Sequence, residues 1–267
     1  MTFPFRVPLR KALAVSALTA LVTLPSMSWA QDEAPTLEGT QPDSLTDIEE
    51  MGTFRLRYST VLRSGHFSDP GSRLNYSGRT GDDFGIYGTA FGLGSFGVVF
   101  EAAREIFFPS IEGDDLRSIT LLRGKLGLAA RAMIGPVRIE TTVAYGVSQL
   151  PSVPETLDPR FLLAVRRSIH LGGRAVVPLP HKLLAEARVE LPLALWAIDG
   201  RGRRLETSGW LAGAMFGRQL WETPRYRTQL FVEWQLARDL ADTATGRSQA
   251  QTVNRFGLTA GISWKDT

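Results

Sequence analysis

The segment VRIETTVAYGV at residues 137–147 decides how this sequence is to be interpreted. Alternate residues differ in polarity along its whole length, with Val137, Ile139, Thr141, Val143, Tyr145 and Val147 on one parity and Arg138, Glu140, Thr142, Ala144 and Gly146 on the other. A period of two is typical of a β-strand with one apolar and one polar face. In a soluble barrel the apolar face points inward, whereas in a barrel that crosses a membrane it points outward to lipid. The function depends on which face is in contact with water.

The first thirty residues predict a secretory signal peptide. Arg6, Arg10 and Lys11 precede the uncharged apolar run 12–24, and Ser28 and Ala30 are the small residues expected before a cleavage site. A helix that spans a membrane needs about 20 apolar residues, and this run is shorter. We therefore expect cleavage after Ala30, so that 1–30 is the leader.

The charge balance changes when the leader is set aside. The whole chain has 30 basic and 27 acidic residues, and the three charges in the leader are all basic. Residues 31–50 hold seven acidic residues and no basic ones, which predicts a disordered acidic arm. Residues 51–267 are consequently basic by seven. The absence of cysteine excludes disulfides and cysteine-ligated metals, and nothing in the charge pattern favours nucleic-acid binding.

Alternating segments recur from residue 51 onward and predict ten strands. Most are 10–18 residues long, whereas an ordinary strand has about 5–6 residues and a membrane-crossing strand needs about 9–11. Segment 181–197 also has helical composition, but Pro192 would break a helix, so a strand with a bulge is expected. The predicted strands are 53–63, 84–94, 95–104, 118–133, 137–147, 160–177, 181–197, 205–221, 225–236 and 252–264.

The connections between these strands alternate between long and short. Short turns are predicted at Gly94–Ser95, Ile134–Pro136, Pro178–Pro180 and Glu222–Pro224, and long loops at 64–83, 105–117, 148–159, 198–204 and 239–251. Bacterial outer-membrane barrels have short periplasmic turns, longer external loops and an even number of strands. A soluble up-and-down barrel has no reason to sort its loops by length.

By this pattern the chain resembles a small Gram-negative outer-membrane β-barrel over about 51–264, at the level of architecture and of no specific family. Its last strand, with Phe256, Leu258, Ala260, Ile262 and Trp264 in alternation, resembles the C-terminal signal that such proteins present to the barrel-assembly machinery. Lys265, Asp266 and Thr267 follow Trp264, whereas family members usually end on the aromatic residue.

The resemblance implies an all-β fold, a ten-stranded antiparallel up-and-down transmembrane β-barrel at 51–267. It also implies an outer-membrane location with both termini in the periplasm and the five long loops outside. The expected partners are outer-membrane lipid and the barrel-assembly machinery, the expected state is a monomer, and neither a cofactor nor a metal is expected.

With the apolar parity in lipid, the charged parity lines the interior. The predicted lumen-lining residues are Arg55, Arg57, Glu101, Arg123, Lys125, Arg131, Arg138, Glu140, Arg166, His170, Arg174, Glu186, Arg188, Glu190, Arg227, Glu233 and Arg255, to which the same parity adds Lys182 and Arg225. This lumen is net basic. The predicted aromatic belt comprises Trp196, Trp210, Trp221, Trp234 and Trp264. Arg167 and Arg218 fall on the lipid-facing parity and are expected near an interface, where long side chains reach water.

Two interpretations of such a lumen compete. Arginine and glutamate could interlock and plug the barrel, or surplus arginines could line a path that favours anions. Eight strands leave an interior that side chains fill, and open porins need 16–18, so ten strands favour a plugged or barely conducting barrel. The predicted function is structural, or narrow passage of small anionic solutes. The alternatives are a surface recognition or adhesion barrel acting through its loops, and a soluble ligand-binding barrel.

An enzyme is the third functional hypothesis. The omptin family of ten-stranded outer-membrane proteases uses carboxylates and an Asp–His pair at the outer rim. Here His66, Asp69, Asp82–Asp83 and Asp114–Asp115 lie in predicted loops, but the omptin spacing is absent. Ser168 and His170 resemble the pair in barrel lipid deacylases with the order reversed, and His170 is expected to belong to the lumen network. No catalytic residue is predicted.

Overall fold

The computed structural model describes residues 50–69, 72–111, 114–152, 161–243 and 246–265. The predicted signal peptide and acidic arm lie outside the described residues, apart from Glu50. That residue was assigned to the arm but is the first residue of strand β1. Within the described ranges, no helix has the length and hydrophobicity needed to cross a membrane.

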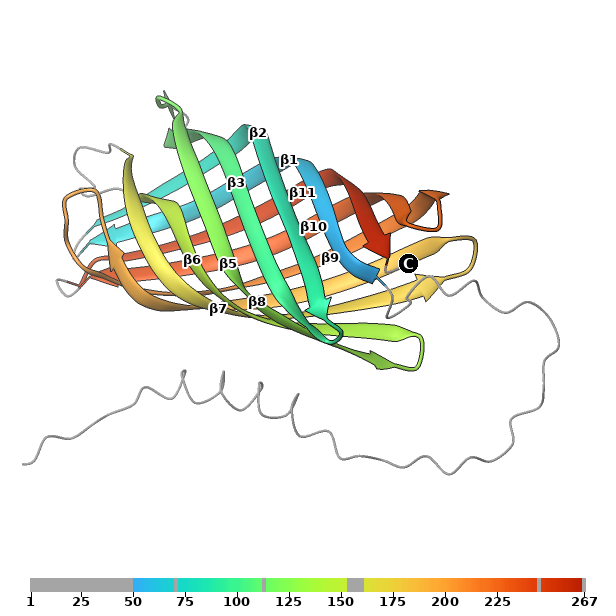
Figure 1. The fold of residues 1–267 in the computed structure, drawn as a ribbon. Coiled ribbons are helices and arrows are strands. Elements are labelled where there is room, and N and C mark those ends of the chain that lie inside the picture. The colour runs from blue at the N-terminus through green and yellow to red at the C-terminus, as the bar shows by residue number, and fades with distance from the viewer. Residues whose placement is uncertain (1–49, 70–71, 112–113, 153–160, 244–245, 266–267) are drawn as a thin grey trace, which may run out of the picture. The chain divides into compact units, whose positions relative to one another are not determined.

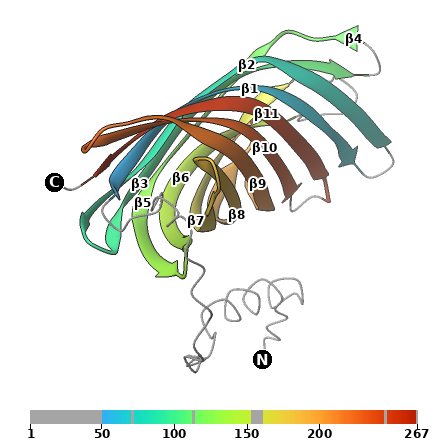
Figure 2. The same ribbon diagram turned by 90° about the vertical axis from the view of Figure 1, so that its right-hand side faces the viewer.

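Eleven antiparallel strands form a closed ring (Figures 1 and 2). Neighbours in sequence pair with one another except that β5 pairs with β3 rather than β4, and the ladder between β1 and β11 joins the first strand to the last. The strands are β1 (Glu50–Asp69), β2 (Ser72–Leu93), β3 (Phe96–Ile111), β4 (Asp114–Asp115), β5 (Ile119–Ile134), β6 (Val137–Ser152), β7 (Leu162–Leu179), β8 (Leu183–Ile198), β9 (Leu205–Glu222), β10 (Tyr226–Thr243) and β11 (Ser248–Lys265).

The count of eleven differs from the predicted ten because of β4. This two-residue strand pairs with Ser110 and Ile111, on the same edge of β3 that β5 occupies from Ile119 onward. The other ten strands have 16–22 residues. The segment with Pro192 is strand β8, since a proline can occupy a strand where no ladder bond is required of it.

The ring has two distinct ends. At the first, called the turn end, the strands are joined by residues 94–95, 135–136, 180–182 and 223–225. Gly94 and Gly135 have φ values of 62° and 57°, which glycine adopts without steric cost. Lys182, predicted to line the lumen, lies in the third turn and is exposed. Arg225, also predicted inward, is exposed in the fourth.

The other end is called the loop end. Some of the five long loops predicted there consist mostly of strand residues. β1 continues to Asp69 and β2 begins at Ser72, so most of the predicted loop 64–83 is strand. Likewise β10 and β11 take up most of the predicted loop 239–251. The sequence pattern missed these strand ends because the polarity of their faces is reversed.

The half of the ring near the turn end is apolar outside. We call its exposed hydrophobic side chains the girdle. The girdle includes exposed residues from nine of the ten long strands, among them Leu56, Tyr58, Phe84, Val98, Leu126, Leu128, Val143, Tyr145, Val189, Phe216, Val232, Phe256 and Leu258, and β7 adds the partly exposed Ile169. The alternate residues of the same strands are charged and buried inside the ring, as Arg55, Arg57 and Glu140 are.

The half near the loop end is polar outside on β1 and β2, where Ser64, Arg73, Asn75, Ser77 and Arg79 are exposed. Its interior instead holds an aromatic cluster, in which the Phe67 and Tyr76 rings stack with their centroids 4.9 Å apart. The buried members of this loop-end cluster are Phe67, Leu74, Tyr76, Phe107, Ile111 and Leu121, and Phe161 packs against them.

One pair of strands is joined over only part of its length. The ladder between β8 and β9 runs from Leu183 opposite Arg218 to Glu190 opposite Leu211 and then stops. Beyond it, one isolated bridge joins Ile198 to Arg204. β8 keeps its ladder with β7, and β9 keeps its ladder with β10, through this region. We call residues 191–197 of β8 and 205–210 of β9 the β8–β9 seam.

Candidate functional site

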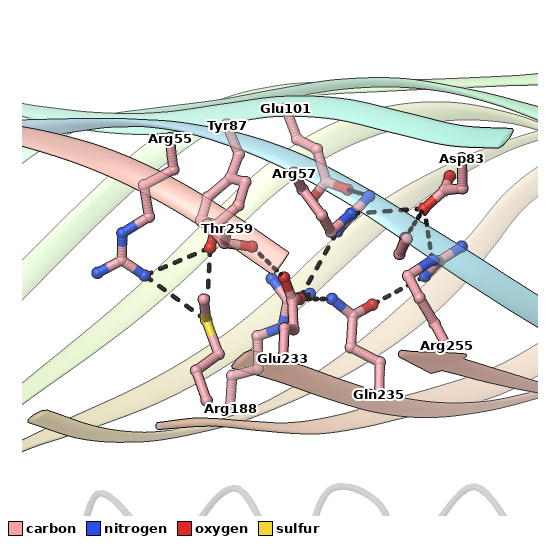
Figure 3. A network of polar contacts seen from close by, with 12 residues as sticks. Arg55, Arg57, Asp83, Tyr87, Glu101, Arg188, Glu233, Gln235, Arg255 and Thr259 are labelled. Carbon is pink, nitrogen blue, oxygen red and sulfur yellow. Dashed lines mark hydrogen bonds and ion pairs between the residues drawn. The ribbon is translucent and has the colours of Figure 1, made fainter. Parts of the chain in front are cut away.

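The interior of the girdle half is the candidate site, and its centre is Glu233 on β10. The carboxylate is buried and accepts hydrogen bonds from Arg188 at 2.9 Å and Thr259 at 2.7 Å. Gln235 also donates to it, and Arg57 lies 3.7 Å away (Figure 3). One carboxylate on β10 thus contacts side chains from β1, β8 and β11 inside the ring, and so holds four strands together.

A second carboxylate, Asp83 on β2, extends the network toward the loop end. Arg255 reaches it at 2.8 Å, Arg57 at 3.5 Å and Arg123 at 3.6 Å, and Ser59 donates a hydrogen bond of 2.5 Å. Figure 3 shows Arg57 and Arg255, from the neighbouring strands β1 and β11, both directed at Asp83. The same three guanidinium groups also pair with glutamates, namely Glu101, Glu105 and Glu233, so the charges around Asp83 are balanced.

Toward the turn end, Glu186 on β8 joins two arginines. Arg55 lies 2.8 Å and Arg174 2.7 Å from the same carboxylate oxygen. Arg174 also reaches Glu140 at 2.9 Å. The Arg55 guanidinium lies 4.6 Å from the centre of the Phe231 ring, a cation–π distance.

Two further groups lie at the margins of this network. At the turn end, Arg138 bridges Glu50 at 2.7 Å and Glu140 at 3.0 Å. At the loop side, Arg63 binds Glu105 at 2.8 Å, just below the aromatic cluster that it touches through Phe107. The charged network and the aromatic cluster are therefore continuous, and together they fill the ring from one end toward the other.

A cavity of about 120 Å³ lies inside the ring where the network meets the β8–β9 seam. Such a volume holds several water molecules or a small polar group. Interior charged side chains and exterior apolar residues both line it, because it reaches the wall at the seam. Its lining includes Arg123, Lys125, Arg166, His170, Arg188 and Glu190 on the inside and Pro192, Trp210 and Leu211 at the seam.

Ser168, His170 and Glu190 form a hydrogen-bonded chain beside this cavity. The Ser168 hydroxyl lies 2.8 Å from Nε2 of His170, whose Nδ1 lies 2.6 Å from Glu190. A Cβ on Gly146 would lie 2.6 Å from His170 Nε2, so this glycine makes room for the ring. The order hydroxyl, imidazole, carboxylate is that of a nucleophilic triad. Ser168, however, has 0% of its surface exposed and does not line the cavity, so no carbonyl can reach its oxygen here.

The structure places the predicted lumen-lining residues inside the ring and brings most of them into direct contact. Arg227 differs, since it pairs with Glu222 at 2.6 Å near the turn end, away from the centre. Arg131 also stays at the turn end, where it donates to the Gly94 carbonyl at 3.0 Å.

Sequence reasoning missed three acidic residues of the interior, Asp83, Glu105 and Asp239. All three were assigned to long loops, although each continues the inward parity of its strand. Asp239 pairs with Arg166 at 2.6 Å. With these counter-ions in place, the interior is much less basic than predicted.

Four of the residues considered for a rim enzyme lie in separate environments: His66, Asp69, Asp82 and Asp83. Asp83 points into the ring, whereas its neighbour Asp82 accepts a hydrogen bond of 2.6 Å from Tyr58 on the exterior. Asp69 pairs with Arg247 at 2.6 Å. His66 is partly exposed and lies on the outward parity of β1. Among the described residues, no group of three or more His, Asp and Glu side chains could hold a metal ion.

Four of the five predicted belt tryptophans lie near strand ends: Trp196 and Trp210 toward the loop end, Trp221 and Trp264 at the turn end. Trp234 lies in the middle of β10. Of the arginines on the outward parity, Arg167 lies 5.1 Å from the centre of the Trp196 ring, and Arg218 is four residues from the turn-end limit of β9.

No protein-family model matches the chain, and no curated protein matches it either. Solved structures do. The outer membrane protease OmpT of Escherichia coli has a TM-score of 0.48 and 8% identity, with 86% of this chain and 100% of that chain covered. An outer-membrane channel of Pseudomonas putida F1 has a TM-score of 0.44 and 12% identity, with 84% and 100% covered. The β domain of the Bordetella autotransporter BrkA has a TM-score of 0.44 and 14% identity, with 81% and 100% covered. The resemblance to Gram-negative outer-membrane β-barrels is one of architecture.

Proposed function

We propose that the chain is an outer-membrane β-barrel whose girdle lies in the hydrocarbon layer. On β1 the girdle extends from Phe54 to Leu62. At about 3.3 Å per residue and a tilt of about 40°, this stretch rises about 20 Å. Outer-membrane barrels have an apolar band about 25 Å tall. A ring that large and apolar on the outside would aggregate in water.

The orientation follows from the two ends of the ring. Glu50 and Lys265, at the outer ends of the first and last strands, pair with one another at the turn end. Short turns lie on the periplasmic side of such barrels, so both termini are periplasmic in this proposal. The loop half, polar on the exterior of β1 and β2, then stands above the membrane on the cell surface.

The barrel does not act as an open pore. The observation that carries this proposal is the network around Glu233 and Asp83, whose side chains link β2, β1, β11, β10 and β8 through the interior of the ring. A buried charge is stable only when it is paired or hydrated, so the network resists opening. The primary role is structural, and any passage is a narrow path through the 120 Å³ cavity. The donors of Arg123 and Arg188 that have no hydrogen-bond partner in that cavity would favour small anions along the path.

Conductance of the purified barrel in a planar bilayer tests this function. We expect no large open-channel steps from the unmodified protein, and any small current to prefer anions over cations. A steady, unselective, porin-like conductance would overturn the proposal, because the packed interior leaves no room for it.

A surface recognition barrel is the second candidate, and the loop-end cluster favours it. Phe67, Tyr76 and Phe107 fill the protruding half, so this half is a folded platform rather than a set of free loops. Substitution of exposed Arg73 and Arg79 to glutamate would then abolish binding to cells or host surfaces. Unchanged binding by a variant that remains folded would argue against it.

A further inference from the structure

The β8–β9 seam interrupts the wall of the barrel at a particular height. Its lower limit is the pair Glu190–Leu211, and the isolated bridge at Ile198 closes it above. Trp196 and Trp210 lie within the seam and are each about two-fifths exposed. Tryptophan concentrates where hydrocarbon meets the head groups, so the seam lies at the outer interface if the girdle is in the membrane. This inference therefore rests on the proposed function.

The interruption of the β8–β9 ladder at that height calls for a physical explanation. Backbone N–H and C=O groups that face hydrocarbon without a partner cost several kcal/mol each, and open sheet edges occur at membrane depth only where they line a water-filled cavity or are covered by protein. Pro192 has no N–H to donate, which removes one donor from the β8 edge. Of the seam residues, Pro192 and Trp210 line the 120 Å³ cavity, as do Glu190 and Leu211 at its lower limit.

Six basic and five acidic side chains line the cavity, and some of its arginines have hydrogen-bond donors left over. Arg188 projects into it with Nε buried and without a hydrogen-bond partner, and Arg123 does so with Nε and one terminal nitrogen. Arg123 lies 3.3 Å from Glu101, in a geometry that makes no hydrogen bond. Free guanidinium donors in a buried site match the oxygens of a phosphate or carboxylate.

The flanks of the seam indicate the side from which that anion arrives. Leu193 and Leu195 are about half exposed next to it, and Trp210 contributes to both the exterior surface and the cavity lining. An apolar approach suits an amphiphile in the membrane, whereas a soluble anion gains nothing from it.

We propose that the β8–β9 seam is a lateral entrance from the outer leaflet, and that the cavity binds the anionic head group of a lipid through Arg123 and Arg188. The acyl chains remain outside against Leu193, Leu195 and Trp210. The cavity, at about 120 Å³, is large enough for a phosphate or carboxylate group but not for a chain.

Single-cysteine labelling of the full chain in phosphatidylcholine vesicles tests this proposal, since the natural chain has no cysteine. Leu211→Cys places a thiol in the cavity lining, and Leu193→Cys places one on the exterior of the same seam. The probes are a phospholipid with a maleimide on its head group and a water-soluble maleimide that does not cross membranes. We expect the lipid probe to label both variants, and to label Leu211→Cys about tenfold faster than the soluble probe does.

The nature of the occupant is tested by competition. Phosphatidic acid in the vesicles should slow labelling of Leu211→Cys about tenfold, and additional phosphatidylcholine or dissolved inorganic phosphate should not. Arg188→Gln and Arg123→Gln, each made in the Leu211→Cys background, should remove that protection. Arg227→Gln, a buried arginine that does not line the cavity, should keep it. Two arginine variants are used so that a refolding failure of one leaves the other.

The possible failures are distinguishable. If the lipid probe labels neither Leu193→Cys nor Leu211→Cys, the membrane placement is wrong. If it labels Leu193→Cys alone, the placement holds and the seam is closed. Faster labelling of Leu211→Cys by the soluble probe would show entry from water. Protection by inorganic phosphate equal to that by phosphatidic acid would overturn the lipid as the source.

Discussion

The two halves of the barrel are built from the same strands with opposite polarity. In the girdle half of β1, Leu56 and Tyr58 are outside and Arg55 and Arg57 inside. In the loop half of the same strand, Ser64 is outside and Phe67 inside. The period of two thus shows which residues share a face, and the surroundings at that height decide which face is in contact with water.

The two halves also differ in what fixes their interiors. The girdle half depends on ion pairs that have been removed from water, and breaking one partner of such a pair leaves an uncompensated charge. The loop half depends on aromatic packing, which has no such penalty. The comparison predicts that charge deletions will be most damaging at mid-barrel, and that added charges will be tolerated on the outside of the loop half.

The largest expected effect is at Glu233. Glu233→Ala removes the acceptor shared by Arg188, Thr259 and Gln235. We expect a loss of about 3–5 kcal/mol in the free energy of unfolding, typical for one partner of a buried ion pair. Urea titration of the barrel in detergent measures it. The exposed Glu206→Ala, on the outward face of β9, is the control and should change stability by less than about 0.5 kcal/mol.

The same variant tests whether the network blocks passage. Glu233→Ala should produce a small anion-preferring conductance in a planar bilayer, and Glu140→Ala should act in the same way because it frees Arg138 and Arg174. If both variants remain folded and silent, ion pairing is not what closes the barrel.

The outer surfaces of the two halves can be compared with one substitution. Val143→Arg in the girdle should cost about 2–4 kcal/mol, the range for arginine on the lipid face of a barrel. Ser77→Arg on the exterior of the loop half should cost close to nothing. Refolding into lipid vesicles gives both values. Equal costs would remove the distinction between girdle and loop half, and Thr142→Arg costing more than Val143→Arg would mean that the faces are inverted.

Paired cysteines compare the joined and unjoined parts of β8 and β9. Ala187→Cys with Ala214→Cys should form a disulfide on oxidation, since these residues are opposite one another in the ladder. That bond should stabilise the barrel by about 2 kcal/mol. Leu193→Cys with Ser208→Cys should not form one, because no ladder holds β8 and β9 together there. Equal yields in the two pairs would mean that the seam is closed.

The smallest effect is expected in the connection between β8 and β9. Burial alone would raise the pKa of Asp199, but hydrogen bonds from Arg203 and Arg201 outweigh this and hold the pKa below its ordinary value. A lowered carboxyl pKa stabilises the folded connection above the ordinary pKa of about 3.9, and that stabilisation is lost as the pH falls through the lowered value.

Asp199→Ala should therefore weaken the connection by about 1 kcal/mol at neutral pH. Hydrogen exchange should show loss of protection at the Arg201 and Arg203 amides, which donate to Asp199 at 2.9 and 2.8 Å. The loss should disappear once the pH falls below the lowered pKa of Asp199. Equal protection in the two proteins at neutral pH would contradict the assignment.

The sequence predicted the girdle half well because both of its faces carry a clear signal. In 137–147 the alternation places Arg138 and Glu140 inside and Val143 outside, as the structure has them. Such a signal needs an apolar exterior. Where the strands leave the girdle, Asp83, Glu105 and Asp239 were taken for loop residues, so the counter-ions of Arg255, Arg63 and Arg166 were missed.

The hydrogen bond between Ser168 and His170 also could not be predicted from the sequence. Two residues apart on a strand, these side chains lie on the same face, and the His170 ring leans along the strand to reach Ser168. The ring does so over Gly146 of the neighbouring strand, which has no side chain to block it. Only the pairing register of β6 and β7 brings that glycine into position.

The ladders between neighbouring strands differ in length, and this bears on where new chain termini could be introduced. β1 and β11 are paired along nearly their whole length, and Glu50 is opposite Lys265 at the turn end. A circular permutant that links these residues and begins in 199–204 would have β9 as its first strand and β8 as its last. In such a protein the barrel would have to close between β8 and β9, where the ladder is incomplete. The fraction of molecules that close correctly would measure how much the native order of the strands contributes to barrel closure.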